Sequence, residues 1–283
     1  MSESVPLKIA VPNKGTLSEA AVEMLVEAGY AGRRDPRVLI VPDPANNAEF
    51  YYLRPRDIAT YVGSGALDVG ITGRDLLLDS DSVAKEVHAL DFGQSTFRFA
   101  APPGVTDIAQ LSGRRVATSY ATLVGSFLRD RGVDAQIVRL DGAVESAVRL
   151  GVADAVADVV STGRTLQAQG LEIFGPVILH SEAILIKGSS THPGMETLLG
   201  RIQGVLVARQ YVLVDYDLPQ QLLSTAVEIT PGLESPTVSP LRDPEWVAVR
   251  VMVPRVDVHR IMDQLYALGA RAILVSSIHA ARI

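Results

Sequence analysis

The feature that most constrains the fold of this chain is an apolar strand that runs directly into a turn rich in hydroxyl groups and glycine. Residues 154–160 alternate small and branched apolar types as a buried strand does, and Ser161-Thr162-Gly163-Arg164-Thr165 then precedes a helix opened by Leu166. Successive backbone N–H groups at such a turn bind anions, and glycine lets the backbone approach a phosphate closely. The segment predicts a strand–turn–helix unit of an α/β protein with a phosphate site at its turn.

The side chains of this turn suit the same ligand. Thr162 and Thr165 would donate hydroxyl groups, and Arg164 would add positive charge. Asp158, at the end of the strand, would bind ribose hydroxyls or steer a Mg²⁺ ion already held by pyrophosphate. The alternative interpretation is an ordinary helix start with a threonine as its N-cap.

A similar pattern occurs earlier in the chain, in residues 65–76. Both copies contain G-x-x-D, then T-G-R, then x-L, and the later copy has the longer loop. Two such units predict two similar lobes that face each other across a cleft, because ligands bind outside the carboxyl ends of parallel strands. Chance similarity between two short α/β segments is the alternative.

Composition limits the class of protein. The chain has 283 residues, 47% of them hydrophobic, and a net charge of −6, which suits a globular protein of two or three domains without an extended nucleic-acid footprint. The absence of cysteine excludes disulfides and thiolate metal sites, and the five histidines lack the spacing of metal ligands. No signal peptide or membrane helix is evident, so we expect a cytoplasmic protein.

Strand and helix patterns divide the chain into three parts. Residues 1–93 and 183–209 are expected to form a first lobe, and residues 94–182 a second lobe with a parallel sheet. Residues 210–283 change rhythm and read as β-α-β-β-α-β, which is a ferredoxin-like unit. The expected strands are at 8–11, 38–41, 50–53, 67–71, 97–101, 115–119, 135–140, 154–160, 182–187, 211–217, 235–241, 246–253 and 271–278. The expected helices are at 16–28, 56–61, around 108, and at 123–131, 143–150, 195–209, 218–228 and 256–268.

Taken together, the motifs resemble those of the long, histidine-regulated type of ATP phosphoribosyltransferase. The most specific part is E-x5-G-x-A-x2-V-x-D-V-x2-T-G-x-T-L, which occupies residues 145–166. Supporting stretches are P-N-K-G at 12–15, L-R-P-R-D-I at 53–58, the segment 63–75 and I-T-P-G-L-E-S-P-T at 229–237. The resemblance covers nearly the whole chain and implies a two-lobed catalytic core like that of periplasmic binding proteins, followed by a regulatory domain.

The reaction implied by the resemblance joins two substrates. N1 of the ATP adenine displaces pyrophosphate from phosphoribosyl pyrophosphate, which is the first step of histidine biosynthesis, and Mg²⁺ is carried mainly by the pyrophosphate. Such a loose transition state requires positioning and neutralisation of the leaving group more than a protein nucleophile, and no nucleophile is assigned. By matching positions, the phosphoribosyl pyrophosphate site would comprise Glu145, Asp158, Ser161, Thr162, Gly163, Arg164 and Thr165.

Three residues of the first lobe match other active-site stretches of the family. Lys14, Arg54 and Asp75 would supply the remaining polyphosphate contacts and recognise ATP. Exposed surface charge is the alternative for Lys14 and Arg54, and helix capping is the alternative for Asp75. Many relatives carry a basic residue where this chain has Thr16, so we expect Lys14 to make the phosphate contact at that turn alone.

For the C-terminal unit the resemblance implies a site at which free histidine binds and inhibits. Asp217 would pair with the imidazole or ammonium group of the ligand, and Thr237 would bond its polar end. Leu233, Met252 and Ala272 would line the pocket, although the last two would be core residues in any such domain. The resemblance also implies a homo-oligomer, a hexamer in equilibrium with a dimer.

Three other functions compete with this interpretation. A two-lobed small-solute binding protein would share the architecture without catalysis, but the two phosphate-type turns argue against it. A catalytically silent regulatory subunit would be expected to lose the S-T-G-R-T turn, which is intact. A phosphoribosyltransferase with another acceptor is the nearest enzymatic alternative.

Overall fold

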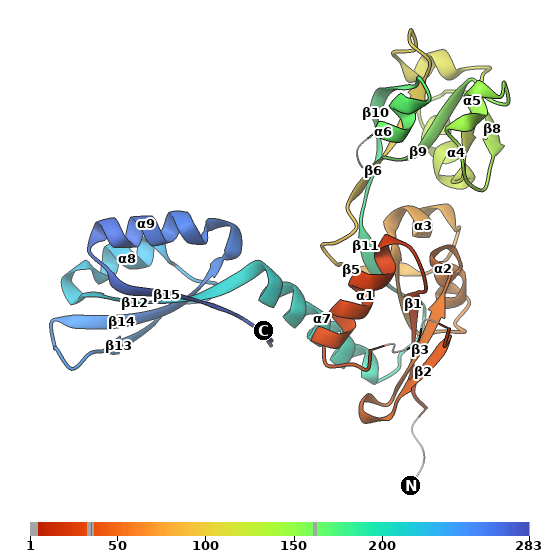
Figure 1. The fold of residues 1–283 in the computed structure, drawn as a ribbon. Helices are drawn as coiled ribbons and strands as arrows, with labels where there is room; N and C mark the ends of the chain where they lie inside the picture. The colour runs from red at the N-terminus through yellow and green to blue at the C-terminus, as the bar shows by residue number, and fades with distance from the viewer. Residues whose placement is uncertain (1–4, 33–34, 36, 161–162, 283) are drawn as a thin grey trace. The chain divides into compact units, whose positions relative to one another are not determined.

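Three β-sheets organise the chain in the computed structural model, which describes residues 5–32, 35, 37–160 and 163–282 (Figure 1). Contacts divide the chain into two compact units, Met1–Glu23 with Ala31–Met195, and Met24–Tyr30 with Glu196–Ile283. The larger unit holds two sheets and the smaller unit holds the third. In the described part of the chain, no helix combines the length and apolar character needed to span a membrane.

The first sheet has six strands in the order β2-β3-β1-β4-β11-β5. Its centre is parallel, because β1 pairs in parallel with both β3 and β4, whereas β2, β11 and β5 pair antiparallel. One face packs its apolar side chains against α2, which buries Ile58, Ala59 and Val62. The elements are β1 (Leu7–Pro12), α1 (Thr16–Glu27), β2 (Ile40–Asp43), η1 (Pro44–Asn46), β3 (Ala48–Leu53), α2 (Pro55–Gly63), β4 (Val69–Gly73), α3 (Arg74–Asp79), β5 (Lys85–Ala89) and β11 (Ala183–Lys187).

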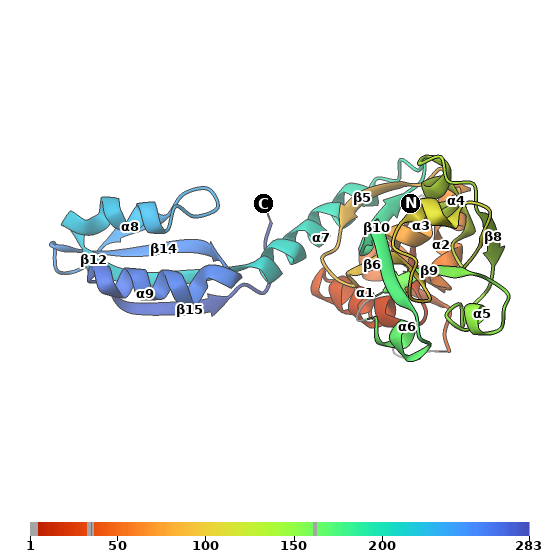
Figure 2. The same ribbon diagram turned by 90° about the horizontal axis from the view of Figure 1, so that it is seen from above.

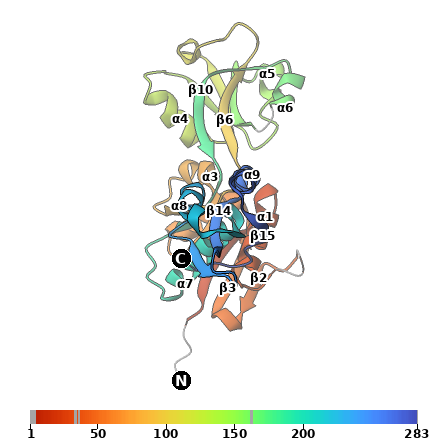
Figure 3. The ribbon, with the colours of Figure 1, turned by 90° about the vertical axis from the view of Figure 1, so that its left-hand side faces the viewer.

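The second sheet has five strands in the order β10-β6-β9-β7-β8. Helix α4 covers one face, over a core that includes Phe97, Phe99 and Phe127, whereas α5 and α6 cover the other (Figure 3). The elements are β6 (Ser95–Ala101), η2 (Ile108–Leu111), β7 (Arg115–Thr118), α4 (Ala121–Arg129), β8 (Gln136–Arg139), α5 (Ser146–Arg149), β9 (Ala155–Val160), α6 (Arg164–Ala168) and β10 (Glu172–Ser181).

The two sheets share one topology. The strands β3-β1-β4-β11-β5 of the first sheet correspond in order and direction to β8-β7-β9-β6-β10 of the second. Strand β4 with helix α3 therefore corresponds to strand β9 with helix α6, and these are the two copies of the T-G-R pattern. The chain passes from the first sheet to the second after β5 and returns after β10, as expected for two lobes that face each other.

The C-terminal unit is a four-stranded antiparallel sheet in the order β13-β14-β12-β15. Helices α8 and α9 lie on one face (Figure 1) and run alongside each other there (Figure 2). Alternate strand residues such as Val214, Tyr216 and Val249 are buried beneath them. This β-α-β-β-α-β order confirms the predicted ferredoxin-like fold. The elements are α7 (Gly194–Gln210), β12 (Tyr211–Pro219), η3 (Gln220–Leu222), α8 (Leu223–Ile229), β13 (Thr237–Pro240), β14 (Trp246–Pro254), η4 (Arg255–Asp257), α9 (Val258–Leu268) and β15 (Arg271–Ser277).

The structure differs from the sequence expectations in a few elements. The second sheet is mixed rather than parallel, because β6 enters from the first sheet and pairs antiparallel with both β9 and β10. Strand β5 was not predicted because its mostly polar residues lie at a partly exposed sheet edge, and β10 was not predicted because Gly175 and Pro176 interrupt its pattern. The helix expected at 143–150 is confined to Ser146–Arg149, since Gly142 and Ala143 adopt positive φ.

Candidate functional site

The described part of the turn between β9 and α6 begins at Gly163. Gly163 adopts φ 71°, in the left-handed region, and an added Cβ there would lie 3.2 Å from Ile173 Cδ1. Arg164 and Thr165 are exposed at the start of α6, and Leu166 anchors the helix in the core. The predicted contacts of Ser161 and Thr162 lie outside the described residues. The described part of the turn thus presents polar residues to solvent from a fixed strand end.

Asp158 lies in an environment that disfavours its charge. Burial raises the pKa of this carboxyl above its ordinary value of 3.8, and the negative charges of Glu145 and Asp75 raise it further. A hydrogen bond of 2.8 Å from the Val159 N–H to Asp158 Oδ1 and the positive charge of Arg56 act in the opposite direction. The structure therefore brings Glu145, Asp158 and Asp75 within electrostatic reach of one another.

Asp75 is held by the second lobe rather than exposed at a helix start. Its side chain is buried, and Ser181 Oγ donates to Asp75 Oδ1 at 2.7 Å. The Asp75 N–H donates in turn to Ser181 Oγ at 3.1 Å. The charge and a hydrogen bond of Asp75, after burial itself, raise the pKa of the Tyr120 hydroxyl. Asp75 is thus an acceptor for hydroxyl groups of the second lobe.

A cavity of about 480 Å³ lies beside these groups, with walls from both lobes of the larger unit. Lys14 and Thr16 line it from the β1–α1 turn, and Asp75 lines it from the start of α3. Arg54 does not line this cavity; it is exposed at the N-cap of α2. The full lining is Lys14, Gly15, Thr16, Leu17, Pro55, Gly73, Asp75, Leu76, Gly93, Gln94, Ser95, Tyr120, Val159, Ser181 and Glu182.

In the T-G-R segment of the first lobe, the arginine already pairs with carboxylates of the protein. Arg74 Nη2 lies 2.7 Å from Glu86 Oε1 and 3.2 Å from Glu182 Oε1, and the hydrogen bond with Glu86 is the main cause that raises the pKa of Arg74. Its Nη1 also donates to the His180 carbonyl at 3.3 Å. Arg74 therefore links Glu86 on β5 to Glu182, which lies between β10 and β11. Its guanidinium is not free to bind an anion.

The carboxylates suit a divalent cation that arrives on a substrate. Among the described residues, no group of three or more His, Asp or Glu side chains is close enough to hold a metal ion. Burial first, and then repulsion by Glu145, raises the pKa of Asp158, and a cation beside the two carboxylates would offset both effects. Few protein ligands would be needed for a divalent cation that stays bound to substrate phosphates.

Three residues of the site were missed in the sequence interpretation. Arg56 belongs to the L-R-P-R-D-I stretch, in which the sequence pattern points equally to Arg54. Tyr120 and Ser181 carry no local signal, because only the pairing of the two lobes brings them to Asp75. Their roles follow from tertiary structure alone.

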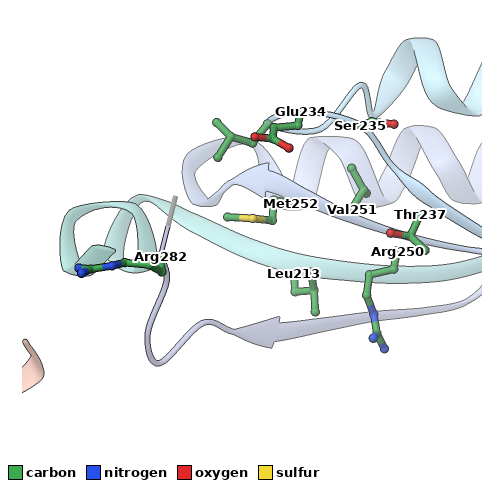
Figure 4. A pocket seen from close by; sticks show the side chains of 9 residues that line it. Leu213, Glu234, Ser235, Thr237, Arg250, Val251, Met252 and Arg282 are labelled. Atoms are coloured by element: carbon green, nitrogen blue, oxygen red, sulfur yellow. The ribbon is translucent and has the colours of Figure 1, made fainter. Parts of the chain in front are cut away.

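A second cavity, of about 320 Å³, lies in the C-terminal unit (Figure 4). Leu233, Thr237 and Met252 line it as the resemblance implies, whereas Asp217 and Ala272 do not. Asp217 pairs with Ala248 and Arg271 along the sheet, and Ala272 has φ 49° at an irregularity in β15. The remaining lining residues are Leu213, Glu234, Ser235, Arg250, Val251 and Arg282.

Two family profiles match consecutive parts of the chain. A family profile described as "ATP phosphoribosyltransferase" matches residues 54–204, and one described as "HisG, C-terminal domain" matches residues 208–280. A protein named ATP phosphoribosyltransferase from Arthrobacter sp. (strain FB24) is 62% identical over 285 residues, covering 98% of this chain and 100% of that protein. A protein of the same name from Paenarthrobacter aurescens (strain TC1) is 64% identical with the same coverage.

A solved structure agrees with these matches. The ATP phosphoribosyl transferase (HisG:HisZ) complex from Thermotoga maritima contains a chain that is 25% identical to this one, with a TM-score of 0.60. The likeness covers 71% of this chain and 98% of that chain.

Proposed function

This chain belongs to the ATP phosphoribosyltransferase family, and we propose that it performs the family's reaction in the cavity between its two lobes. The family transfers the phosphoribosyl group of phosphoribosyl pyrophosphate to N1 of ATP, with release of pyrophosphate, as the first step of histidine biosynthesis. The family reaction also requires a divalent metal. A solute-binding protein without catalysis is not favoured, because the relatives that match over the full length are enzymes.

The observation that carries the placement is the position of Asp158, a carboxyl whose pKa burial raises, next to Val159 of the cavity wall and just before the β9–α6 turn. The turn of residues 161–165 would hold the 5-phosphate, while Asp158 would accept hydrogen bonds from the ribose hydroxyls. Glu145 would share with Asp158 the charge of Mg²⁺ carried by the pyrophosphate. A bound cation and the ribose hydroxyls would thus stabilise the Asp158 carboxylate, whose ionised form is unfavourable in the free protein.

The first lobe would supply the second substrate's contacts. Lys14 lines the cavity and would neutralise the polyphosphate, since Thr16 cannot carry charge there. Asp75, held by Ser181, would accept a hydrogen bond from the nucleotide. Arg54 lies exposed at the start of α2 and would reach the polyphosphate from outside the cavity. Because the transition state is loose, these groups would act by position and charge.

The test is product formation from ATP and phosphoribosyl pyrophosphate with Mg²⁺ and added pyrophosphatase. We expect Asp158→Asn to lower kcat/KM by roughly 100-fold or more, as loss of a charged transition-state contact does. The matched control is Asp154→Asn, just before the same strand, where Arg115 pairs with the carboxylate at 3.0 Å. Equal activities of the two variants would overturn the placement of the site.

We further propose that the C-terminal domain, residues 210–283, binds free histidine as an inhibitor. The matching C-terminal family profile and the cavity lined by Leu233, Thr237 and Met252 support this proposal. Asp217 and Ala272 would join the ligand only from outside the cavity described here. We propose that residues 1–93 with 183–209 form one lobe of the catalytic core and residues 94–182 the other. Contacts group Met24–Tyr30 and the residues from Glu196 onward with the C-terminal sheet.

We also propose a cytoplasmic homo-oligomer, a hexamer in equilibrium with a dimer. The proposal is supported by the match to the family's C-terminal domain profile and by the structural relative from Thermotoga maritima, which is part of a complex. Sedimentation velocity with and without histidine tests it, with a species of six chains expected when histidine is present. A monomer under all conditions would contradict it.

A further inference from the structure

Helix α4 of the second lobe is capped by a residue of the first lobe. The N-cap residue of α4 is Tyr120, and its side chain makes no capping hydrogen bond. Instead Asp79 Oδ1 accepts from the backbone N–H groups of Thr122, at 3.0 Å, and Leu123, at 3.2 Å. The first N–H groups of a helix lack intrahelical partners, so this carboxylate supplies across the lobes what a local side chain usually supplies.

The position of Asp79 suits that contact better than it suits its own helix. It is the last residue of α3, where a carboxylate opposes the dipole of its own helix. Its side chain is only 10% exposed, so it is not a solvated surface charge. At the N-terminus of α4 the same charge is favourable.

Arg56 makes a second connection to the same segment. Its Nη1 lies 3.5 Å from Asp79 Oδ2 and donates to the Ser119 carbonyl at 3.0 Å. Its guanidinium carbon lies 4.4 Å from the centroid of the Tyr120 ring, at cation–π distance. Arg56 and Asp79 of the first lobe thus hold the residues that lead into α4.

The segment they hold includes a wall of the cavity. Tyr120 lines the cavity, its ring packs edge-on against Phe97 at 5.0 Å, and its hydroxyl interacts with Asp75. Neither Arg56 nor Asp79 lines the cavity itself. Both residues therefore act on the site through the segment 119–123.

We propose that Arg56, Asp79 and the segment 119–123 form an interlobe latch that fixes the spacing of the two lobes for phosphoribosyl transfer. Arg56 and Asp79 are positioning residues and do not contact the substrates. The inference rests on the proposed placement of the site, in which each lobe holds one substrate. Because small misplacement of two bound reactants slows their reaction by about 100-fold, loss of the latch lowers kcat. The KM for phosphoribosyl pyrophosphate, which the second lobe holds, changes little.

The test uses the full-length protein and four variants. Asp79→Ala removes the cap and the ion pair, whereas Asp79→Asn keeps a carbonyl oxygen that caps helices well. Arg56→Lys keeps the charge but loses the planar fork that bridges two acceptors. The control is Asp81→Asn, which removes the charge of an exposed carboxylate close by in the chain and keeps a residue type that tolerates its left-handed φ of 56°.

A distance between the lobes is the second readout. The chain has no cysteine, so Thr60→Cys on α2 and Gln136→Cys on β8, both exposed, take spin labels selectively. We expect Asp79→Ala to lower kcat by about 10- to 100-fold and to broaden the distance distribution of the labelled pair. Asp79→Asn should keep kcat within about threefold, because the cap persists. Arg56→Lys should fall between the two Asp79 variants, and Asp81→Asn should match the parent.

The outcomes separate the latch from the proposed function. If the parent turns over and Asp79→Ala changes neither kcat nor the distance distribution, the latch is wrong and the site stands. If kcat falls only in step with the folded fraction seen by circular dichroism, the residues are merely structural and the latch is likewise overturned. Should Asp79→Ala fail to fold, Arg56→Lys carries the same test. A parent without turnover would instead contradict the proposed function.

Discussion

At the scale of single residues, Asp158 carries a charge that is unfavourable in the free protein and that a bound ligand would stabilise. Its carboxyl is desolvated and lies near Glu145 and Asp75, so its ionised form is less favourable in the folded protein than in the unfolded chain. Functional sites commonly concentrate such costs, because the ligand relieves them. The same residue is therefore expected to lower stability and to support activity.

Asp158→Asn is predicted to unfold at a higher temperature than the parent at pH 7. Because the folded-state pKa is raised, protonation favours the folded parent, and its stability is lost as pH rises from the unfolded value of 3.8 through the folded pKa. The neutral amide avoids this loss, so the advantage of the variant should shrink as pH falls through that window. Thermal unfolding at pH 7 and near pH 4 measures it; equal stability at pH 7 would contradict the account.

At the scale of elements, the β9–α6 turn depends on one glycine. Gly163 adopts a left-handed φ and would bring a Cβ close to Ile173. Gly170, just after α6, has a similar φ of 72° but nothing within 4 Å of an added Cβ. Substitutions at the two glycines therefore separate the effect of a left-handed φ, which both positions share, from the effect of distorting the β9–α6 turn.

Gly163→Ala and Gly170→Ala should each destabilise the protein by about 1–2 kcal/mol, the cost of an L residue in the left-handed region. Only Gly163→Ala should also raise the KM for phosphoribosyl pyrophosphate, by roughly tenfold or more, because it distorts the proposed phosphate turn. Chemical denaturation and initial rates measure the two effects. A matching rise in KM for Gly170→Ala would show that strain alone explains the result.

Local sequence patterns predicted those elements whose signals are local. The alternation at 154–160 and the helix end at Gly269 both carry their own signature, and β9 and α9 are present. The partly exposed strand β5 and the interrupted strand β10 depend on neighbours that sequence periodicity does not encode. Strand β6 was predicted at 97–101, but its antiparallel pairing with β9 was not. The site residues divide in the same way. A local motif predicts Glu145 and Asp158, whereas only the fold brings Tyr120 and Ser181 to Asp75.

At the scale of the whole molecule, catalysis and regulation are assigned to separate units. The larger unit holds the interlobe cavity, and the smaller unit holds the cavity lined by Leu233, Thr237 and Met252. The proposed inhibition by histidine would require two global states with different histidine affinity, and substrates and histidine would then weaken each other's binding reciprocally. Changes in the smaller cavity should therefore alter inhibition without altering the uninhibited rate.

Thr237→Ala is predicted to raise the histidine concentration for half-inhibition by about tenfold, the cost of one lost hydrogen bond to a charged ligand. The uninhibited kcat should stay within about twofold of the parent, because Thr237 is not part of the larger unit. Asp217→Asn, outside the cavity, tests whether that carboxylate reaches the ligand. Inhibition unchanged by both variants would place histidine elsewhere.

The most direct measurement is the rate of product formation from ATP and phosphoribosyl pyrophosphate, with Mg²⁺ and added pyrophosphatase. It compares the parent with Asp158→Asn and Asp154→Asn. The account predicts turnover by the parent and by Asp154→Asn, and a loss of roughly 100-fold or more in kcat/KM for Asp158→Asn alone. Full activity of Asp158→Asn would contradict the assignment of the β9–α6 turn as the phosphoribosyl pyrophosphate site.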